Sequence, residues 1–163
     1  MSEKLYTLAQ TILAGARAKR LKIVTAESCT GGLVAGALTD VAGSSDVFER
    51  GLVTYSNEAK QDCLGVPQQT LEQFGAVSAE TARAMAEGAL ARTPAAQLSV
   101  AVTGIAGPGG GTPTKPVGLV FFAAARTGHD TLVEERRFGD IGRQAIRTES
   151  VETALNLLCR RLA

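Results

Sequence analysis

The chain has 163 residues, of which 45% are hydrophobic and only 4% aromatic, with no tryptophan. A chain of this length buries about 70% of the surface that it exposes when unfolded, so we expect a single domain over residues 1–163 with an aliphatic and alanine-rich core. Seventeen basic and sixteen acidic side chains leave a net charge of +1, which argues against a nucleic-acid-binding surface. No apolar stretch approaches the ~20 residues that cross a bilayer, and the first residues, "MSEKLYTLAQ", lack the basic-then-apolar layout of a signal peptide, so we expect a cytoplasmic protein.

The three cysteines, Cys29, Cys63 and Cys159, are odd in number and far apart in the sequence. They form neither a disulfide framework nor a Cys-x-x-Cys pair. Together with His129, the only histidine, they lack the spacing of a Cys₃His zinc site. We therefore expect no zinc site at these residues, and we expect no cofactor.

The first elements in chain order are a helix, a strand and a second helix. Apolar residues three and four positions apart predict a helix from Leu5 to Ala16, with Ser2 as its N-cap. A short buried strand is predicted at residues 22–27, and a helix at residues 30–41. The motif "TAESCTGG", residues 25–32, is thus a strand-to-helix turn.

A second strand runs through Val53 and Tyr55, and three short-to-medium helices follow it. They are a helix within "NEAKQDCLG" capped by Asn57 or Ser56, a helix with Pro67 at its first position and Gly75 past its end, and a helix from the cap Ser78 to about Arg92.

The last third of the chain contains three predicted strands and a helix. Residues 96–104 form the third strand, and residues 116–125 and 131–138 flank a turn at Gly128 as an antiparallel pair. A helix at residues 142–162 completes the chain. The alternation of strands and helices predicts an α/β fold, a three-layer α/β/α sandwich around a mixed, mostly parallel five-stranded sheet.

Ser28 is the first candidate nucleophile, because it lies where a strand ends and a helix begins. The N–H groups of Thr30, Gly31 and Gly32 would lack partners within that helix, so they could hold an oxyanion, and Glu27 beside them is a further candidate for substrate binding. The alternative is that Ser28 or Thr30 is only the N-cap of the helix.

Lys60 is the candidate base, because the lone histidine makes a Ser-His-Asp triad improbable. It lies in the first turn of its helix, where a cation is disfavoured and its pKa is lowered. Tyr55 could relay a proton or orient the lysine. The alternative is a solvated lysine near Glu58 or Asp62, and the sequence has no Ser-x-x-Lys motif, so Ser28 and Lys60 must meet in space.

Cys29 is the rival nucleophile, since a thiol at a helix N-terminus can have a lowered pKa. The alternative is a small buried residue of the core. Alternation along the turn points Ser28 and Cys29 to opposite sides.

The segment "GIAGPGGGTPTKPVG" could form an anion-binding loop through its backbone amides, beginning at Gly104, or a surface connection. It fits neither a Walker A loop nor G-x-G-x-x-G. Thr103, at the carboxyl end of its strand, is the better candidate for a ligand site.

Arg143 and Arg147, four residues apart near the start of the last helix, suit a phosphate, or else pair with Asp140 and Glu149.

Taken together, "TAESCTGG", "GSSDVFERGLVTYSNEAK", "LGV", "GAVS", "VTGIAGPGGG" and "KPVGLVFFA" resemble the CinA C-terminal family over essentially the whole chain. The enzymatic members of that family are nicotinamide-nucleotide amidases. The resemblance implies a three-layer α/β/α fold without a metal, and hydrolysis of the carboxamide of nicotinamide mononucleotide to nicotinate mononucleotide and ammonia.

The resemblance also implies roles for individual residues. Ser28 resembles the nucleophile, Lys60 its base, Tyr55 a supporting group and Thr103 a residue of the same pocket. An arginine of "GRQAIR" would hold the phosphate, and both Arg143 and Arg147 stay open for that role. The expected partners are a small nucleotide and further copies of the chain, rather than nucleic acid or a membrane.

The hypothesis from the sequence is therefore a Ser-Lys amidase that forms an acyl-enzyme. Two alternatives stand beside it: a nucleotide-binding or regulatory domain without turnover, and an amidase that depends on Cys29.

Overall fold

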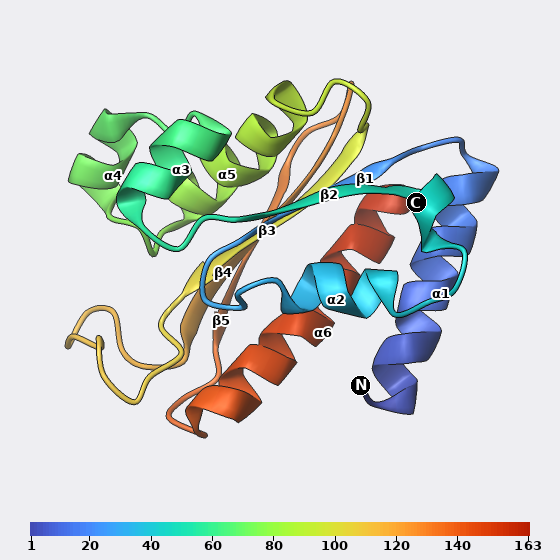
Figure 1. The fold of residues 1–163 in the computed structure, drawn as a ribbon. Coiled ribbons are helices and arrows are strands. Elements are labelled where there is room, and N and C mark those ends of the chain that lie inside the picture. Colours follow the sequence, from blue (N-terminus) through green and yellow to red (C-terminus); the bar gives the residue numbers. More distant parts are fainter.

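The alternating helical and extended segments build one five-stranded sheet with a layer of helices on each face (Figure 1). The computed structural model describes all residues, 1–163. In chain order the elements are α1 (Glu3–Ala18), β1 (Ile23–Glu27), α2 (Leu33–Thr39), the 3₁₀-helix η1 (Ser44–Asp46), β2 (Phe48–Val53), α3 (Asn57–Leu64), α4 (Gln68–Phe74), α5 (Ala79–Ala91), β3 (Leu98–Gly104), β4 (Leu119–Arg126), β5 (Leu132–Arg137) and α6 (Arg143–Leu162).

The strand order is β2-β1-β3-β4-β5. β1 pairs in parallel with β2 and with β3, whereas β4 pairs antiparallel with β3 and with β5. Four strands therefore run in one direction and only β4 is reversed. The predicted three-layer fold, mixed sheet and late hairpin are confirmed, although the strand pairings are divided equally between parallel and antiparallel.

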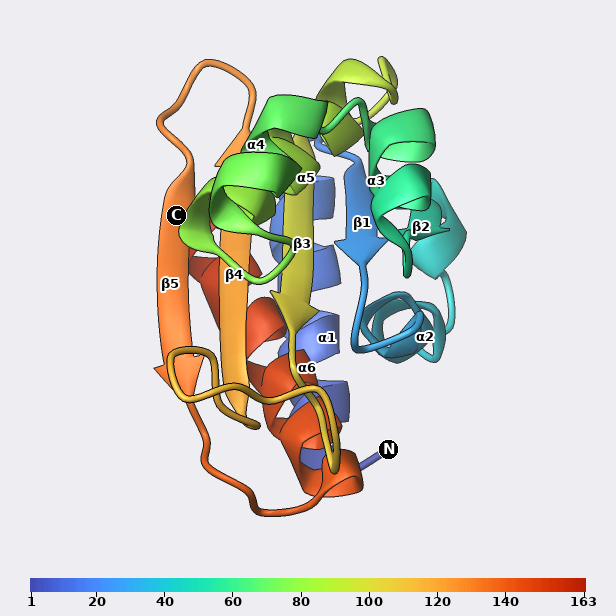
Figure 2. The ribbon, with the colours of Figure 1, turned by 90° about the vertical axis from the view of Figure 1, so that its left-hand side faces the viewer.

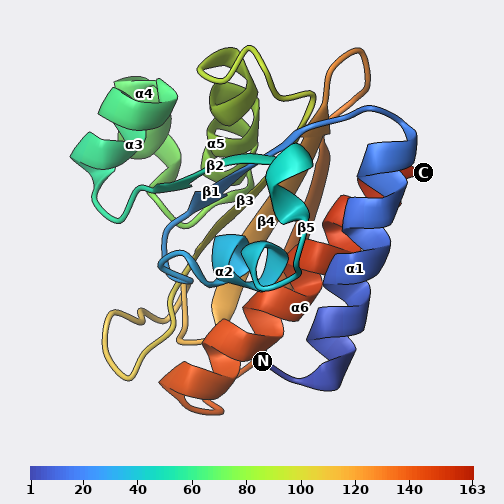
Figure 3. The same ribbon diagram turned by 45° about the vertical axis from the view of Figure 1, so that its right-hand side comes forward.

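Two hydrophobic cores hold the layers together. The larger, of 26 buried residues, lies between the sheet and α1, α2 and α6, and Figure 3 shows α1 running alongside α6 in this layer. The smaller, of 13 buried residues, lies between the sheet and the layer formed by α3, α4 and α5. Because strand side chains alternate, Val100 and Val102 of β3 face the larger core and Ala101 faces the smaller one.

The helix ends follow the predicted caps with two corrections. The hydroxyls of Ser2, Ser56 and Ser78 accept hydrogen bonds from the first turns of α1, α3 and α5. Helix α2 begins at residue 33 and not at residue 30, because two consecutive glycines before it adopt left-handed φ angles. Pro67 is the N-cap of α4, one position before the predicted one.

No helix combines the length and the apolar character needed to cross a membrane.

The topology brings two strand–helix junctions together at one edge of the sheet. β1 and β2 are parallel neighbours, so their carboxyl ends lie side by side (Figure 2). The chain leaves β1 for α2, in the layer of the larger core, and leaves β2 for α3, in the opposite layer. Side chains from both junctions can therefore meet between the layers.

Candidate active site

The first junction places Ser28 at the carboxyl end of β1. Its N–H donates to the Val102 carbonyl at 2.9 Å, so the residue is still held by the ladder to β3. Gly31 and Gly32, with φ of +59° and +99°, then turn the chain into α2. In open α/β sheets, ligands gather at the carboxyl ends of strands where neighbouring connections diverge to opposite faces. Ser28 occupies such a position.

The carboxylate of Glu27, and no hydroxyl, satisfies the N-terminus of α2. Its Oε1 accepts from the Val34 N–H at 2.7 Å and from Thr30 Oγ1 at 2.8 Å, and Oε2 accepts from the Ala35 N–H at 3.2 Å. The negative charge is buried against the positive end of the helix, where it is stabilising. The interpretation of Ser28 or Thr30 as the N-cap is therefore wrong, and the Ser28 hydroxyl is available for other contacts.

The second junction brings the amine of Lys60 to that hydroxyl. Lys60 Nζ lies 3.0 Å from Ser28 Oγ and 2.8 Å from the carbonyl oxygen of Thr54, and the carbonyl oxygen of Tyr55 is 3.5 Å away. The lysine is 1% exposed, and none of the ion pairs includes it. The alternative of a solvated surface lysine is therefore wrong. The carbonyl of Thr54 was not among the predicted groups, because a backbone acceptor leaves no signal in residue types.

Burial lowers the pKa of Lys60 from 10.5 to about 8, and the nearby Cys29 opposes this effect only in part. The sequence argument required burial beside a second cation in addition to the helix dipole, and loss of hydration on burial is the main cause here. About one tenth of the lysine is neutral at pH 7 with such a pKa. The amine can thus accept a proton near neutrality.

Cys29 is placed differently from its neighbour. Its side chain is 5% exposed and packs in the larger core. Burial raises the pKa of the thiol from 9.0 to about 11, and the nearby Lys60 and Arg147 offset this only in part. The thiol is therefore protonated near neutral pH, which disfavours it as a nucleophile.

Tyr55 contributes its two ends to different contacts. Its backbone carbonyl faces Lys60, whereas its phenol is exposed and accepts from Arg143 Nη2 at 3.1 Å. Arg143 Nη1 donates in turn to the Gly107 carbonyl at 2.8 Å. The phenol forms no hydrogen bond with Lys60 or Ser28, so the structure does not bring it into a proton relay. Arg143 instead links the second junction to the loop after β3.

The two arginines of the last helix have different surroundings. Arg147 is half-buried, and its Nε and Nη2 donate to the carbonyls of Cys29 and Thr30 at 3.1 and 3.2 Å. It therefore holds the turn that carries Ser28. Arg143 is exposed at the first position of α6. Neither arginine forms an ion pair, so pairing with Asp140 or Glu149 is wrong.

The end of β3 is tightly packed. Thr103 is buried and donates its hydroxyl to the Ala76 carbonyl at 2.7 Å. A Cβ at Gly104 would lie 2.7 Å from Val120 Cγ2, so only glycine allows β4 this close. The loop that follows is tied down by internal bonds and by Lys115 Nζ, which donates to the Phe74 carbonyl at 2.6 Å.

The turn after Ser28 contains backbone N–H groups that have no backbone acceptor. The Gly31 N–H donates to the Ser28 carbonyl at 3.0 Å, but no backbone carbonyl accepts from the N–H of Thr30 or Gly32. Of the three predicted donors, Gly31 is thus engaged within the turn.

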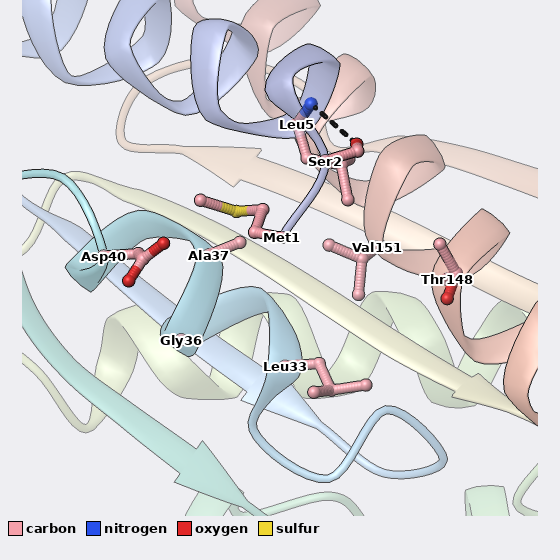
Figure 4. Close-up of a pocket in the computed structure, with 9 residues that line it drawn as sticks. All are labelled: Met1, Ser2, Leu5, Leu33, Gly36, Ala37, Asp40, Thr148 and Val151. Atoms are coloured by element: carbon pink, nitrogen blue, oxygen red, sulfur yellow. Dashed lines mark hydrogen bonds between the residues drawn. The ribbon is translucent and has the colours of Figure 1, made fainter.

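The surface cavity drawn in Figure 4 lies elsewhere. It has a volume of about 440 Å³ and is framed by the start of α1, by α2 and by α6. Its lining comprises Met1, Ser2, Leu5, Leu33, Gly36, Ala37, Asp40, Thr148 and Val151, and none of these is a predicted site residue. Nor do three or more His, Cys, Asp or Glu side chains lie together as potential metal ligands; all three cysteines are free.

The fold and the site define an α/β domain with a buried serine–lysine pair at the junction of a parallel strand pair. The comparison with known sequences gives the family: the model of the CinA C-terminal domain matches residues 5–162. The chain belongs to this family.

Relatives agree with this assignment. The chain is 49% identical, over 95% of its length and 96% of the relative, to the "Nicotinamide-nucleotide amidohydrolase PncC" of Enterobacter agglomerans. It is 54% identical, over 93% of its length, to a CinA-like protein of a Synechococcus species. It spans about a third of the length of that protein and of the other longer curated relatives. Among solved structures, the competence/damage inducible protein CihA of Agrobacterium tumefaciens superposes with a TM-score of 0.97 at 52% identity, covering 100% of this chain and 98% of the other.

Proposed function

We propose that the protein is a nicotinamide-nucleotide amidase that uses Ser28 as nucleophile and Lys60 as its base. The observation that carries the proposal is the 3.0 Å approach of Lys60 Nζ to Ser28 Oγ in a buried site. The amidohydrolase name of a relative that is 49% identical over nearly its whole length supports the substrate class.

The first step follows from the hydrogen bonds of the amine. A neutral lysine has two N–H bonds and one lone pair. The N–H bonds face the carbonyls of Thr54 and Tyr55, so the lone pair is left for the hydroxyl proton of Ser28. Ser28 Oγ attacks the carboxamide carbon of the substrate while its proton passes to Lys60.

The developing oxyanion needs fixed donors. The N–H groups of Thr30 and Gly32 are free of backbone acceptors, and Arg147 holds the intervening turn through the carbonyls of Cys29 and Thr30. Donors that are held before the reaction stabilise the tetrahedral intermediate without reorganising.

Collapse of the intermediate breaks the C–N bond, and the Lys60 ammonium gives its proton to the departing nitrogen, which leaves as ammonia. The product is an ester between Ser28 and the nicotinoyl group. Water then attacks this ester with Lys60 again as base, which releases the nicotinate nucleotide and restores the serine hydroxyl.

The phosphate of the substrate is assigned to Arg143. Its guanidinium is exposed and lies at the N-terminus of α6, a 20-residue helix whose first amides favour an anion. We expect Arg143→Gln to raise KM for nicotinamide mononucleotide about tenfold, the equivalent of one charge-assisted hydrogen bond. The corresponding nucleoside, which has no phosphate, should show no such difference between variant and wild type.

The test of the proposal is ammonia release from nicotinamide mononucleotide, with mass spectrometry of the intact protein to detect the acyl-enzyme. We expect Ser28→Ala and Lys60→Ala each to lower kcat by at least about 10³-fold, and Cys29→Ala to retain activity. Full activity of Ser28→Ala together with loss in Cys29→Ala would select the thiol mechanism. Calorimetric binding of the nucleotide by a wild type that releases no ammonia would select a non-catalytic binding domain.

A further inference from the structure

The C-terminal end of α3, the helix that carries Lys60, packs on α5 at a glycine. A Cβ added to Gly88 would lie 1.9 Å from the carbonyl oxygen of Leu64 and 3.0 Å from its carbonyl carbon. Gly88 lies inside α5 and is not among the glycines with positive φ. It is therefore required for space and not for backbone conformation.

The same end of α3 is fixed by two further groups. Arg92, which ends α5, donates from Nη1 to the Asp62 carbonyl at 2.9 Å. The Leu64 side chain, 1% exposed, packs in the smaller core with residues of α5 such as Met85. Gly88 and Arg92 together form what we call the α5 dock.

The α5 dock is connected to Lys60 through the backbone. Leu64 follows Lys60 by one helical turn, and the carbonyl of Lys60 accepts from the Val66 N–H at 3.1 Å, just beyond the docked carbonyl. Because α3 has only eight residues, a shift of its end moves the whole helix. The amine at the other end of the side chain depends on contacts of 2.8 and 3.0 Å.

We propose that Gly88 is a positioning residue, which sets the distance between Lys60 Nζ and Ser28 Oγ by letting α3 seat against α5. An alanine methyl would need the Leu64 oxygen to withdraw from 1.9 Å to at least 3.0 Å, a movement of 1.1 Å. Misplacement of reacting groups by about 1 Å can lower a rate on the order of 10²-fold. The inference rests on the proposed function for its kinetic consequence, but the placement of the lysine can be measured without substrate.

The experiment compares Gly88→Ala with Gly15→Ala, a matched glycine inside α1 whose added Cβ would meet only Leu162 Cδ1, at an ordinary 3.6 Å. The chain has five lysines, so their side-chain NMR resonances can be followed against pH in ¹³C-labelled protein, with Lys60 assigned from Lys60→Arg. We expect Lys60 to titrate near 8 in wild type and in Gly15→Ala, and above about 9 in Gly88→Ala, because a displaced amine regains hydration. In the amidase assay we expect kcat of Gly88→Ala to fall on the order of 10²-fold with KM within about threefold.

A milder variant covers the case in which Gly88→Ala does not fold. Arg92→Ala removes an exposed guanidinium from the α5 dock and adds no steric conflict, and Arg83→Ala is its control on the same helix. We expect the Lys60 titration to move upward in Arg92→Ala only, with kcat lowered roughly threefold. An unchanged Lys60 titration in a folded Gly88→Ala, or in Arg92→Ala when the former does not fold, would overturn the positioning role. Absence of ammonia release from wild type would overturn the proposed function and leave the NMR comparison decisive for the α5 dock.

Discussion

The buried amine of Lys60 makes a prediction about the pH dependence of activity. With a pKa of about 8, roughly one tenth of the lysine is neutral at pH 7, against about 1 in 3,000 for a lysine that titrates at 10.5. Burial thus increases the neutral form, which the proposed mechanism uses as the base, about 300-fold at pH 7. We expect kcat for nicotinamide mononucleotide to rise about tenfold per pH unit below pH 7, to pass half its maximum near pH 8 and to level off above pH 9.

The same burial makes a prediction about stability. The folded protein holds Lys60 with a pKa of about 8, below its unfolded value of 10.5, so the unfolded chain binds more protons between these two pH values. The free energy of unfolding must therefore rise with pH in this window. The difference of 2.5 pH units corresponds to about 3 kcal/mol that the buried charge costs below pH 8 and that is relieved by pH 10.5.

A pair of variants separates Lys60 from the other groups that titrate. We expect the stability of wild type relative to Lys60→Met, measured by urea unfolding, to increase by about 3 kcal/mol between pH 7 and pH 10.5. Lys19→Met, which removes an exposed lysine, should show a difference that is nearly constant. A constant difference for Lys60→Met, or a kcat that does not change between pH 6 and 9, would refute the reasoning.

Three further predictions concern the residues around the pair. Glu27→Gln should lower the free energy of unfolding by about 1–2 kcal/mol, because an amide can accept from fewer of the three donors and has no charge for the helix end. The control Glu3→Gln, at an exposed position, should lower it by less than about 0.5 kcal/mol, and urea titration measures both variants. Thr103→Val should lower the free energy of unfolding by about 1–2 kcal/mol in the same titration, since the buried Ala76 carbonyl loses its donor. A kcat of this variant within about threefold of wild type would assign Thr103 to packing and not to chemistry. Gly104→Ala should lower the free energy of unfolding by about 1–3 kcal/mol, because the new methyl conflicts with β4. The control Gly36→Ala, with nothing within 4 Å of the new methyl, should leave the stability unchanged, and thermal unfolding distinguishes the two variants.

The sequence predicted the order and type of all major elements because their signals are local. Ser2, Ser56 and Ser78 stand directly before apolar periodic segments, and each of them caps its helix. The start of α2 was the exception. Its capping group is Glu27, which lies on the preceding strand and reaches forward to Val34 and Ala35, whereas an ordinary N-cap bonds two or three residues ahead.

The contact between Ser28 and Lys60 could be anticipated from the requirement of the chemistry and from the family resemblance, but from no local pattern. Nothing local connects residues 32 positions apart; the parallel pairing of β1 and β2 brings their ends together. The groups that complete the site escaped prediction for another reason. The Thr54 carbonyl that binds the amine and the glycine contact of Gly88 with Leu64 involve backbone atoms, so no pattern of side-chain types marks them.

The placement of Arg147 and Glu27 explains how a five-residue turn can stay rigid while it keeps free donors. Residues 28–32 contain two glycines in left-handed conformations, which alone would make the turn adaptable. Glu27 holds the side that faces α2 by accepting N–H and O–H groups, and Arg147 holds the other side by donating to carbonyls. Neither side chain binds the N–H groups of Thr30 and Gly32, which also lack a backbone acceptor. A carboxylate in place of Arg147 could not bind the carbonyls of Cys29 and Thr30 and would compete for the N–H groups of the turn. The negative charge of Glu27 on the α2 side and the positive charge of Arg147 on the α6 side are therefore both part of the mechanism that we propose.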